Sequence, residues 1–286
     1  VHQGYLEPHA CLVSVAKDGQ ATIWSSSQGH FMVRSATAIM TGLNVADIRA
    51  IPAEIGGGFG GKTIVYLEPL ALIMARISGF PVKMVMTREE VFLATGPTSG
   101  SWNTVKIGAT KEGKITAATA TFRFQAGAFP GSPARPAASC AFAPYEIENV
   151  QAIGYDVVMN RPKSNAYRAP GAPIAAFSVE SAIDELAREL SLDPVEFRLK
   201  NAAKEGTRAA YGPTFRKVGF VETLDAAKSH PHYSAPLGPN QGRGVASGFW
   251  FNVGGESSAQ IHVNEDGTVT VITGHPDIGG SRASMV

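Results

Sequence analysis

Cysteine is scarce in this sequence, and neither charge is in excess. Only Cys11 and Cys140 occur among the 286 residues, without a CxxC motif or a Cys/His cluster. This excludes a disulfide framework and a thiolate site for zinc or an iron–sulfur cluster. The 25 basic and 24 acidic side chains leave a formal net charge of +1, without the Lys/Arg excess that neutralises a phosphate backbone. We therefore expect two buried, unreactive thiols and no nucleic-acid partner.

Long apolar runs are also absent. No stretch reaches the roughly 18 apolar residues of a membrane span, and the N-terminal segment lacks the order of a signal peptide. We expect a cytoplasmic chain with one large or about two ordinary domains. Because the chain opens on Val1 and stops at Val286 inside a patterned segment, we also expect it to be a fragment of a longer protein.

Alternating patterns predict three β-hairpins. Residues 12–24, 105–124 and 259–272 alternate apolar and polar side chains around an Asp-Gly or Glu-Gly turn. The first and third stretches can be superposed on their Asp-Gly turns, which gives a weak internal repeat and suggests two related domains. Residues 229–244, rich in Pro, Gly and His, are the best candidate for a linker. We expect His230 and His232 in this stretch to lie in a solvated loop.

Other segments have the spacing of helices. Residues 175–190 repeat apolar side chains at intervals of three and four. This predicts an amphipathic helix with its acidic residues facing outward, namely Glu180, Asp184, Glu185 and Glu189. Asp193 followed by Pro194 predicts the start of another helix that runs to about residue 203. The fold class is therefore α+β (mixed α/β).

A glycine-rich loop at residues 56–63 matches the phosphate-loop pattern G-x-x-x-x-G-K-[ST]. In a nucleotide-binding protein a helix would begin at Lys62, but Pro69 would then clash with the carbonyl of Val65. The proline therefore predicts that the helix begins near Glu68 instead. In the alternative interpretation, the glycines let the main chain approach a flat cofactor and Phe59 lies at the tip of the loop.

This loop resembles the molybdenum-cofactor loop in large subunits of the xanthine dehydrogenase, aldehyde oxidase and aerobic carbon monoxide dehydrogenase family. Six motifs match in the same order and span nearly the whole chain. They are Gly4-Tyr-Leu-Glu-Pro-His9, Ser27-Gln-Gly29, Ile55-Gly-Gly-Gly-Phe-Gly-Gly-Lys62, Asn165-Ala-Tyr-Arg-Ala-Pro-Gly171, Asp193-Pro-Val-Glu-Phe-Arg-Leu-Lys-Asn201 and Asp277-Ile-Gly-Gly-Ser281.

The resemblance implies an oxidoreductase that hydroxylates or oxidises an electron-poor carbon with water as the oxygen source. It implies a molybdenum–molybdopterin cofactor, expected as the cytosine dinucleotide, within the α+β fold of the family. It also implies 2Fe-2S and FAD centres on an iron–sulfur subunit and an FAD subunit, with an oligomer of heterotrimers. The expected domains are a first molybdenum-cofactor-binding domain, residues 1–232, and the truncated beginning of a second, residues 233–286.

Carried over residue by residue, the resemblance gives the expected site. Gln28, Phe59 and Arg168 are the expected catalytic residues: Gln28 donates from its amide to the cofactor, Phe59 lies beside it, and Arg168 holds a substrate carbonyl or carboxylate. The expected cofactor-binding set is Gln28, Gly58, Phe59, Gly60, Arg168, Gly279, Gly280 and Ser281. No side chain of this chain is expected to ligate the metal.

Two departures from the family narrow the range of candidate substrates. Thr63 stands where purine-oxidising members carry a glutamate, and Ala169 stands where the carbon monoxide enzymes carry a cysteine. Aldehydes, heteroaromatics and aromatic thioesters remain. The catalytic glutamate is expected downstream, because Glu7 and Glu68 lie next to prolines and fit structural caps better. We therefore expect this fragment alone to be inactive. A phosphate-loop nucleotide-binding protein and a non-catalytic scaffold of the same fold remain the alternatives.

Overall fold

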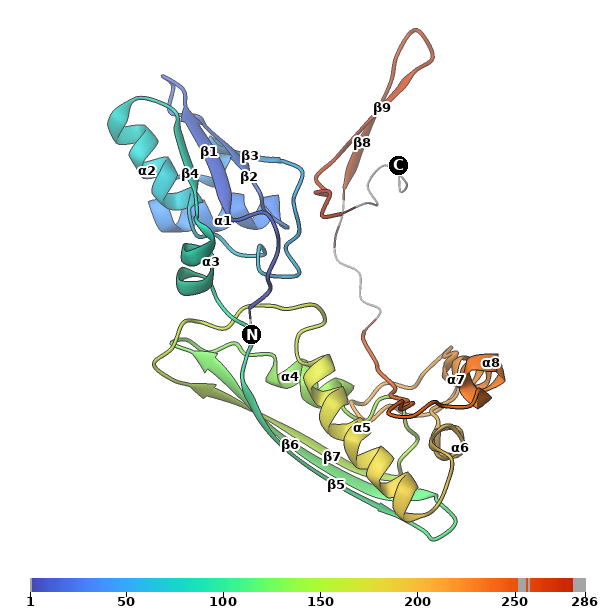
Figure 1. Ribbon diagram of the computed structural model, residues 1–286. Helices are drawn as coiled ribbons and strands as arrows, with labels where there is room; N and C mark the ends of the chain where they lie inside the picture. Colours follow the sequence, from blue (N-terminus) through green and yellow to red (C-terminus); the bar gives the residue numbers. More distant parts are fainter. Residues whose placement is uncertain (1, 252–255, 257, 280–286) are drawn as a thin grey trace. The chain divides into compact units, whose positions relative to one another are not determined.

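The computed structural model describes residues 2–251, 256 and 258–279, so Gly280 and Ser281 lie outside the described residues. The chain divides into two units (Figure 1). Unit 1 holds residues 2–98, 161–168 and the described part of 253–279, and unit 2 holds residues 99–160 and 169–251. The domain boundary predicted at residues 232 and 233 stays a prediction.

Unit 1 contains a four-stranded sheet in the order β3-β2-β1-β4. Its elements are β1 (Ala10–Val15), β2 (Ala21–Ser25), α1 (His30–Thr41), the short 3₁₀ helix η1 (Val45–Asp47), β3 (Ile48–Pro52), α2 (Glu68–Ser78), β4 (Val82–Val85) and α3 (Arg88–Ala94). Strands β2 and β3 are parallel, so the chain must cross over between them, and α1 makes this crossing. The remaining strand pairs of this sheet are antiparallel.

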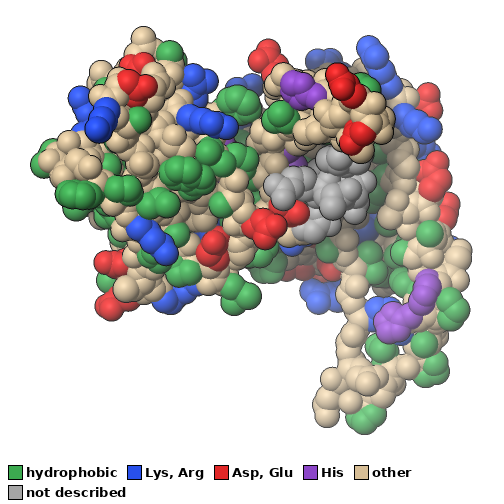
Figure 2. Space-filling model, turned by 90° about the horizontal axis from the view of Figure 1, so that it is seen from above, with side chains coloured by type: hydrophobic (Ala, Val, Ile, Leu, Met, Phe, Trp, Pro, Cys, Tyr) green, Lys and Arg blue, Asp and Glu red, His purple; other side chains and the backbone are tan. Residues whose placement is uncertain are grey.

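The loops that follow β2 and β3 hold Gln28 and the glycine-rich stretch with Gly58, Phe59 and Gly60. Helices α1 and α2 pack against the sheet and bury a core that includes Val13, Ile23 and Leu72. Their outward faces carry exposed apolar side chains such as Ile39 and Ile77, and hydrophobic side chains are visible on the surface of the molecule (Figure 2). Pro69 occupies the first turn of α2, where it costs no hydrogen bond, so this helix begins where the sequence predicted.

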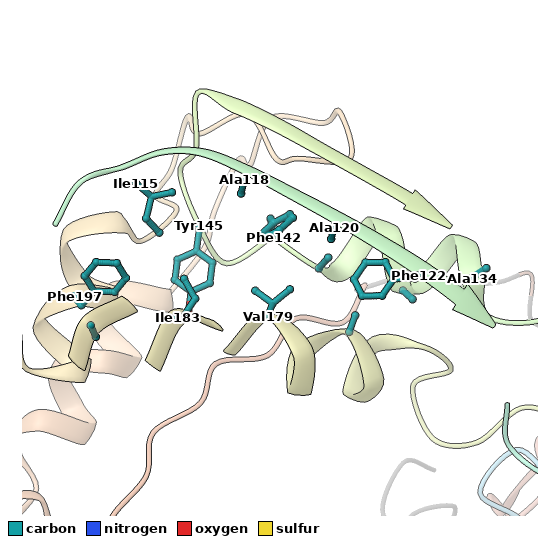
Figure 3. Packing of buried hydrophobic residues seen from close by; sticks show 14 of the residues in the cluster. Ile115, Ala118, Ala120, Phe122, Ala134, Phe142, Tyr145, Val179, Ile183 and Phe197 are labelled. Carbon is teal, nitrogen blue, oxygen red and sulfur yellow. The ribbon is translucent and has the colours of Figure 1, made fainter. Parts of the chain in front are cut away.

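Unit 2 is built on a three-stranded sheet in the order β5-β6-β7. Its elements are β5 (Ser101–Ala109), β6 (Ile115–Gly127), α4 (Ala134–Cys140), β7 (Asn149–Val158), α5 (Ala172–Glu189), α6 (Pro194–Asn201), α7 (Phe220–Ser229) and α8 (Pro231–Ser234). Phe122 of β6, Phe142 after α4, and Val179 and Ile183 of α5 form the centre of its core (Figure 3). The spacing of Val179 and Ile183 places both on the face of α5 that packs on the sheet.

All three predicted hairpins are present. They are β1–β2, β5–β6 and the pair β8 (Ala259–Val263) and β9 (Val269–Thr273). In the first and third, Val15 and Val263 each end the first strand, as the superposition predicted. The β5–β6 hairpin has the same pattern of backbone hydrogen bonds at its turn, so this turn is no evidence of duplication. The internal repeat stays a prediction.

The predicted helices are confirmed, with one correction. The side chain of Asp193 accepts hydrogen bonds from the N–H groups of Val195 and Glu196, as expected of an N-cap. On α5, Asp184 is exposed as predicted, but Glu180 is 5% exposed. The outward placement of Glu180 was therefore wrong, because Arg198 of α6 lies against it and pairs with its carboxylate at 2.8 Å.

The predicted linker contains regular structure. Residues 231–234 form α8, and the hydroxyl of Tyr233 donates to the carboxylate of Asp193 at 2.6 Å. This segment therefore packs against the start of α6. His230 and His232 are exposed as expected, but His232 lies within α8 and His230 precedes its first residue, so the prediction of a loop was wrong for His232.

Both cysteines lie in the interior, as expected. Both thiols are free and buried. Burial, aided by the carboxylate of Glu68, raises the pKa of Cys11 to about 12, and burial raises the pKa of Cys140 to about 11. Reactive cysteines have a lowered pKa and are accessible, whereas both of these thiols are buried and have a raised pKa. Within the described part of the chain, no helix combines the length and apolar character needed to cross a bilayer.

Candidate functional site

Residues 56–62 form an irregular loop between β3 and α2. The N–H of Gly61 donates to the carbonyl of Gly58 at 2.7 Å, which folds the tip into a tight turn. Phe59 lies on this tip with a left-handed backbone (φ +50°) and a side chain that is 44% exposed. Such a backbone is strained for a bulky residue and is held only where the surroundings fix it. The loop thus presents an aromatic ring to its outside.

Gln28 holds this loop from the turn between β2 and α1. Its side-chain oxygen Oε1 accepts hydrogen bonds from the N–H of Gly60 at 2.8 Å and of Lys62 at 3.3 Å. Its own N–H donates to the carbonyl of Lys62 at 2.9 Å. Because both loop partners are donors, the amide must turn its oxygen to the loop and its NH₂ away. That NH₂ has no acceptor among the described residues.

The segment that carries Arg168 packs on the other side of the loop. The N–H of Arg168 donates to the carbonyl of Phe59 at 2.9 Å. A Cβ added to Gly60, whose φ is +96°, would lie 2.6 Å from the carbonyl oxygen of Ala166. Only glycine permits this approach of two main chains. The side chain of Arg168 is exposed and makes no ion pair within the described part of the chain.

The structure therefore brings together five of the predicted residues, namely Gln28, Gly58, Phe59, Gly60 and Arg168, all in unit 1. Gly58 is in contact with Gln28, since a Cβ there would lie 2.3 Å from Gln28 Oε1. Of the second predicted segment, Gly279 is described, and its N–H donates to the carboxylate of Asp277 at 3.0 Å. The carbonyl of Asp277 accepts from the N–H of Ile55 at 3.1 Å.

The structure contradicts the phosphate-loop hypothesis. Lys62 is 0% exposed, and its Nζ pairs with Glu7 Oε2 at 2.6 Å instead of being presented at the loop surface. Burial lowers the pKa of Lys62, and Glu7 opposes this effect. No helix begins at the loop, because α2 starts six residues later at Glu68. A phosphate-binding loop needs both the free lysine and the helix N-terminus.

Both glutamates considered as bases have structural partners. Glu7 accepts from Lys62 and from the N–H of Gly56 at 2.9 Å. Glu68 is buried and accepts from the hydroxyl of Ser25 and the N–H of Tyr66. Their assignment as structural residues is thus supported. The sequence did not reveal the pairing of Glu7 with Lys62, although Glu7 lies in a matched motif.

Comparison with known proteins identifies the family. Residues 1–202 match the model of the molybdopterin cofactor-binding domain. Since this match covers more than half of the chain, the chain belongs to that family.

The chain is similar to part of several longer proteins. It is 32% identical over 288 residues to the aldehyde oxidoreductase molybdenum-binding subunit PaoC of Escherichia coli K12, covering 96% of this chain and 38% of that protein. It is 31% identical to the nicotinate dehydrogenase large molybdopterin subunit of Eubacterium barkeri, covering 78% of this chain and 54% of that protein. The chain thus spans about two fifths to half the length of these curated relatives.

Solved structures agree with this assignment. The aldehyde oxidoreductase of Desulfovibrio gigas matches with a TM-score of 0.81 and 26% identity, over 95% of this chain and 31% of that one. The Cu,Mo-CO dehydrogenase matches with a TM-score of 0.70 and 28% identity, over 80% of this chain and 31% of that one. The predicted α+β fold of this family is therefore confirmed.

Proposed function

We propose that the chain is the molybdopterin-binding part of an oxidoreductase that hydroxylates or oxidises an aldehyde or an electron-poor heteroaromatic carbon, with water as the oxygen source. The observation that carries the proposal is the orientation of Gln28, whose carbonyl oxygen is held by two loop N–H groups so that its NH₂ is free to donate. Membership of the family supports it, as do the names of the aldehyde oxidoreductase relatives.

The donors at the tip of the loop fit this cofactor. The N–H groups of Gly57, Gly58 and Phe59 have no acceptor within the described part of the chain, and they join the NH₂ of Gln28 and the guanidinium of Arg168. Consecutive free N–H groups with left-handed residues among them form a concavity for anionic and oxygen-containing groups. Molybdopterin presents such groups, together with a flat ring system that an exposed aromatic can flank.

Each side chain then has a role. The bound cofactor supplies the two-electron redox chemistry. Gln28 would hold the cofactor through its amide N–H, and Phe59 would lie at the flank of the cofactor. Gly58 and Gly60 would let the loop approach the cofactor closely enough for both contacts. Arg168 would orient a substrate carbonyl or carboxylate by paired hydrogen bonds and stabilise negative charge that develops on it. Gly279, Gly280 and Ser281 would add backbone N–H groups from the second segment.

The remaining assignments extend the same proposal. Thr63 supports a substrate other than a purine, because its hydroxyl donates to the carbonyl of Gly60 at 2.7 Å and it brings no carboxylate. Ala169 supports a substrate other than carbon monoxide, because it brings no thiolate for a copper ion.

We further propose that the cofactor is the cytosine dinucleotide form of molybdopterin, and that partner subunits carry the 2Fe-2S and FAD centres. The proposed assembly is an oligomer of heterotrimers in the cytoplasm.

The function is tested first by the molybdenum content of the protein. The full open reading frame, co-expressed with its neighbouring genes in a host that makes the cofactor, is expected to carry close to one molybdenum atom per chain by elemental analysis. A control enzyme loaded in the same host shows that the cofactor is available. A folded complex without molybdenum contradicts the proposal and favours the scaffold alternative.

The site assignment predicts a large loss of turnover in the double variant Gln28→Ala/Arg168→Ala. Each side chain contributes a charge-assisted or cofactor-directed hydrogen bond, so kcat/KM for an aldehyde is expected to fall by roughly 10²-fold or more. Arg135, on α4 in unit 2, offers Arg135→Ala as a matched control that should keep full turnover. Unchanged turnover in the double variant would show that the site is elsewhere.

A further inference from the structure

The two ends of the glycine loop meet at one carboxylate oxygen. Oε2 of Glu7 accepts from the N–H of Gly56 at 2.9 Å and from Nζ of Lys62 at 2.6 Å. The N–H of Glu7 in turn donates to the carbonyl of Gly56 at 3.1 Å. A single side chain from the N-terminal segment therefore ties residues 56 and 62 together, and the tip that carries Phe59 lies between them.

Lys62 transmits this constraint to Gln28. Its side chain is completely buried, and Glu7 is the acidic group that pairs with it among the described residues. Its Nζ lies 5.0 Å from the centre of the Tyr5 ring, while its main chain exchanges hydrogen bonds with Gln28 in both directions. A buried ammonium with one anionic partner cannot move without losing that partner. Its fixed position therefore fixes the atoms that orient the Gln28 amide.

The packing beneath the loop supports the same role. A Cβ at Gly56 would lie 2.5 Å from the Cβ of Glu7, and a Cβ at Gly61 would lie 2.7 Å from Cε1 of Tyr5. Arg88 of α3 holds the segment itself by donating to the carbonyls of Tyr5 at 2.6 Å and Leu6 at 2.8 Å. Residues 5–7 are thus held in place by Arg88, and they in turn hold the glycine loop through Glu7.

We propose that Glu7 is a positioning residue that, with Lys62 as its partner, acts as a clasp and sets the conformation of the glycine loop before cofactor binds. The glutamate–lysine pair is then required for the loop to accept the cofactor, and it takes no part in the reaction itself. The expected effect on cofactor loading rests on the proposed function. The expected effect on the loop does not, because it is measured in protein without the cofactor.

The test separates loop order from overall stability. Three variants are compared with the wild type in the full open reading frame, produced in a host that lacks the cofactor: Glu7→Gln, Lys62→Met and the double variant. Glu7→Gln leaves a buried ammonium without its anion and is expected to lower the melting temperature most, whereas Lys62→Met leaves a carboxylate that is 35% exposed and still solvated. The double variant has no buried charge and is expected to recover thermal stability.

The decisive readout is amide hydrogen exchange at Gly60, Gly61 and Lys62. The clasp predicts exchange at least about ten-fold faster in all three variants, including the stable double variant, because the local hydrogen bonds open more often. Exchange in β1, an inner strand of the sheet of unit 1, should return to the wild-type rate in the double variant. Lys228→Met, which removes the exposed ion pair with Glu196 on another part of the chain, is the matched control and should leave loop exchange unchanged.

Loading is measured in a second set of preparations from a host that makes the cofactor. The double variant is expected to retain less than about a third of the molybdenum of the wild type, because the closed loop itself is no longer held in the one conformation that would accept the cofactor. Wild-type protein without molybdenum would refute the proposed function, and loop exchange would still decide on the clasp. Loop exchange that stays at the wild-type rate in the variants, or that recovers together with stability in the double variant, overturns the clasp.

Discussion

Replacing Gly60 by alanine is expected to remove nearly all bound molybdenum from an otherwise folded protein. The new Cβ would lie 2.6 Å from the carbonyl oxygen and 2.8 Å from the carbonyl carbon of Ala166, and these are main-chain atoms that no rotamer change can move. The φ of +96° adds strain that L side chains avoid. Together these effects cost about 1–3 kcal/mol or more, which lowers the ratio of competent to displaced loop by roughly five- to 150-fold or more.

The loop would relieve the clash by moving away from the segment of Arg168. That movement breaks the hydrogen bond from the N–H of Arg168 to the carbonyl of Phe59 and the bond from the N–H of Gly60 to Gln28. Elemental analysis of molybdenum per chain measures the outcome, with the far-ultraviolet circular dichroism spectrum as evidence of folding. Full loading of the Gly60→Ala protein would mean that the cofactor does not depend on this loop.

Two other glycines provide matched controls for this substitution. Gly79 at the end of α2 also has a positive φ, of +71°, but a Cβ there would meet nothing within 4 Å. Gly79→Ala therefore isolates the backbone strain. Gly29 adjoins Gln28 in sequence, and a Cβ there would lie 3.5 Å from the Cβ of Met32, an ordinary contact. Both variants are expected to keep their molybdenum, so a loss in either would point to general damage.

Local features of the fold were predictable from the sequence because short-range physics determines them. A turn residue between alternating strands is enough to set a hairpin, as at Gly19 between β1 and β2. Pro69 decided between two interpretations of one motif, since its ring is compatible with the first turn of a helix and incompatible with the third. The structure places it in the first turn of α2.

Contacts between distant parts of the chain were not predictable in the same way. The hydrogen bond between Arg168 and Phe59 joins residues more than a hundred positions apart, and the expectation that both belong to one site relied on resemblance alone. Glu180 shows why pattern fails: helical spacing assigns a face, but it does not reveal a partner on another helix that makes burial of a charge tolerable. Glu7 and Lys62 were missed for the same reason.

Replacing Arg198 by methionine is expected to produce the largest loss of stability in unit 2. Arg198 is 0% exposed and donates from Nε to Glu180 at 2.9 Å and from Nη2 to Asp184 at 2.7 Å. It also donates to the carbonyls of Pro194 at 3.0 Å and Val245 at 2.9 Å. One guanidinium thus connects α5, α6 and the segment that follows α8.

The loss comes from what Arg198→Met leaves behind. Glu180 would remain as a buried carboxylate without a cation, and breaking a buried pair in this way lowers the free energy of unfolding by about 3–5 kcal/mol. Urea unfolding followed by circular dichroism measures it. Lys228→Met removes a pair in which both side chains are close to half exposed, and it is expected to leave the midpoint nearly unchanged because solvent screens such pairs.

A second substitution shows whether the ion pair of Arg198 and Glu180 itself stabilises the protein, or whether each charge only offsets the cost of burying the other. In Arg198→Met/Glu180→Met no buried charge remains, so much of the stability lost in Arg198→Met is expected to return. The hydroxyl of Tyr145 and the N–H of Ser247 would still lose the Glu180 carboxylate as acceptor, and recovery should therefore be incomplete. A double variant as unstable as the single one would mean that the hydrogen bonds, rather than the uncompensated charge, account for the loss.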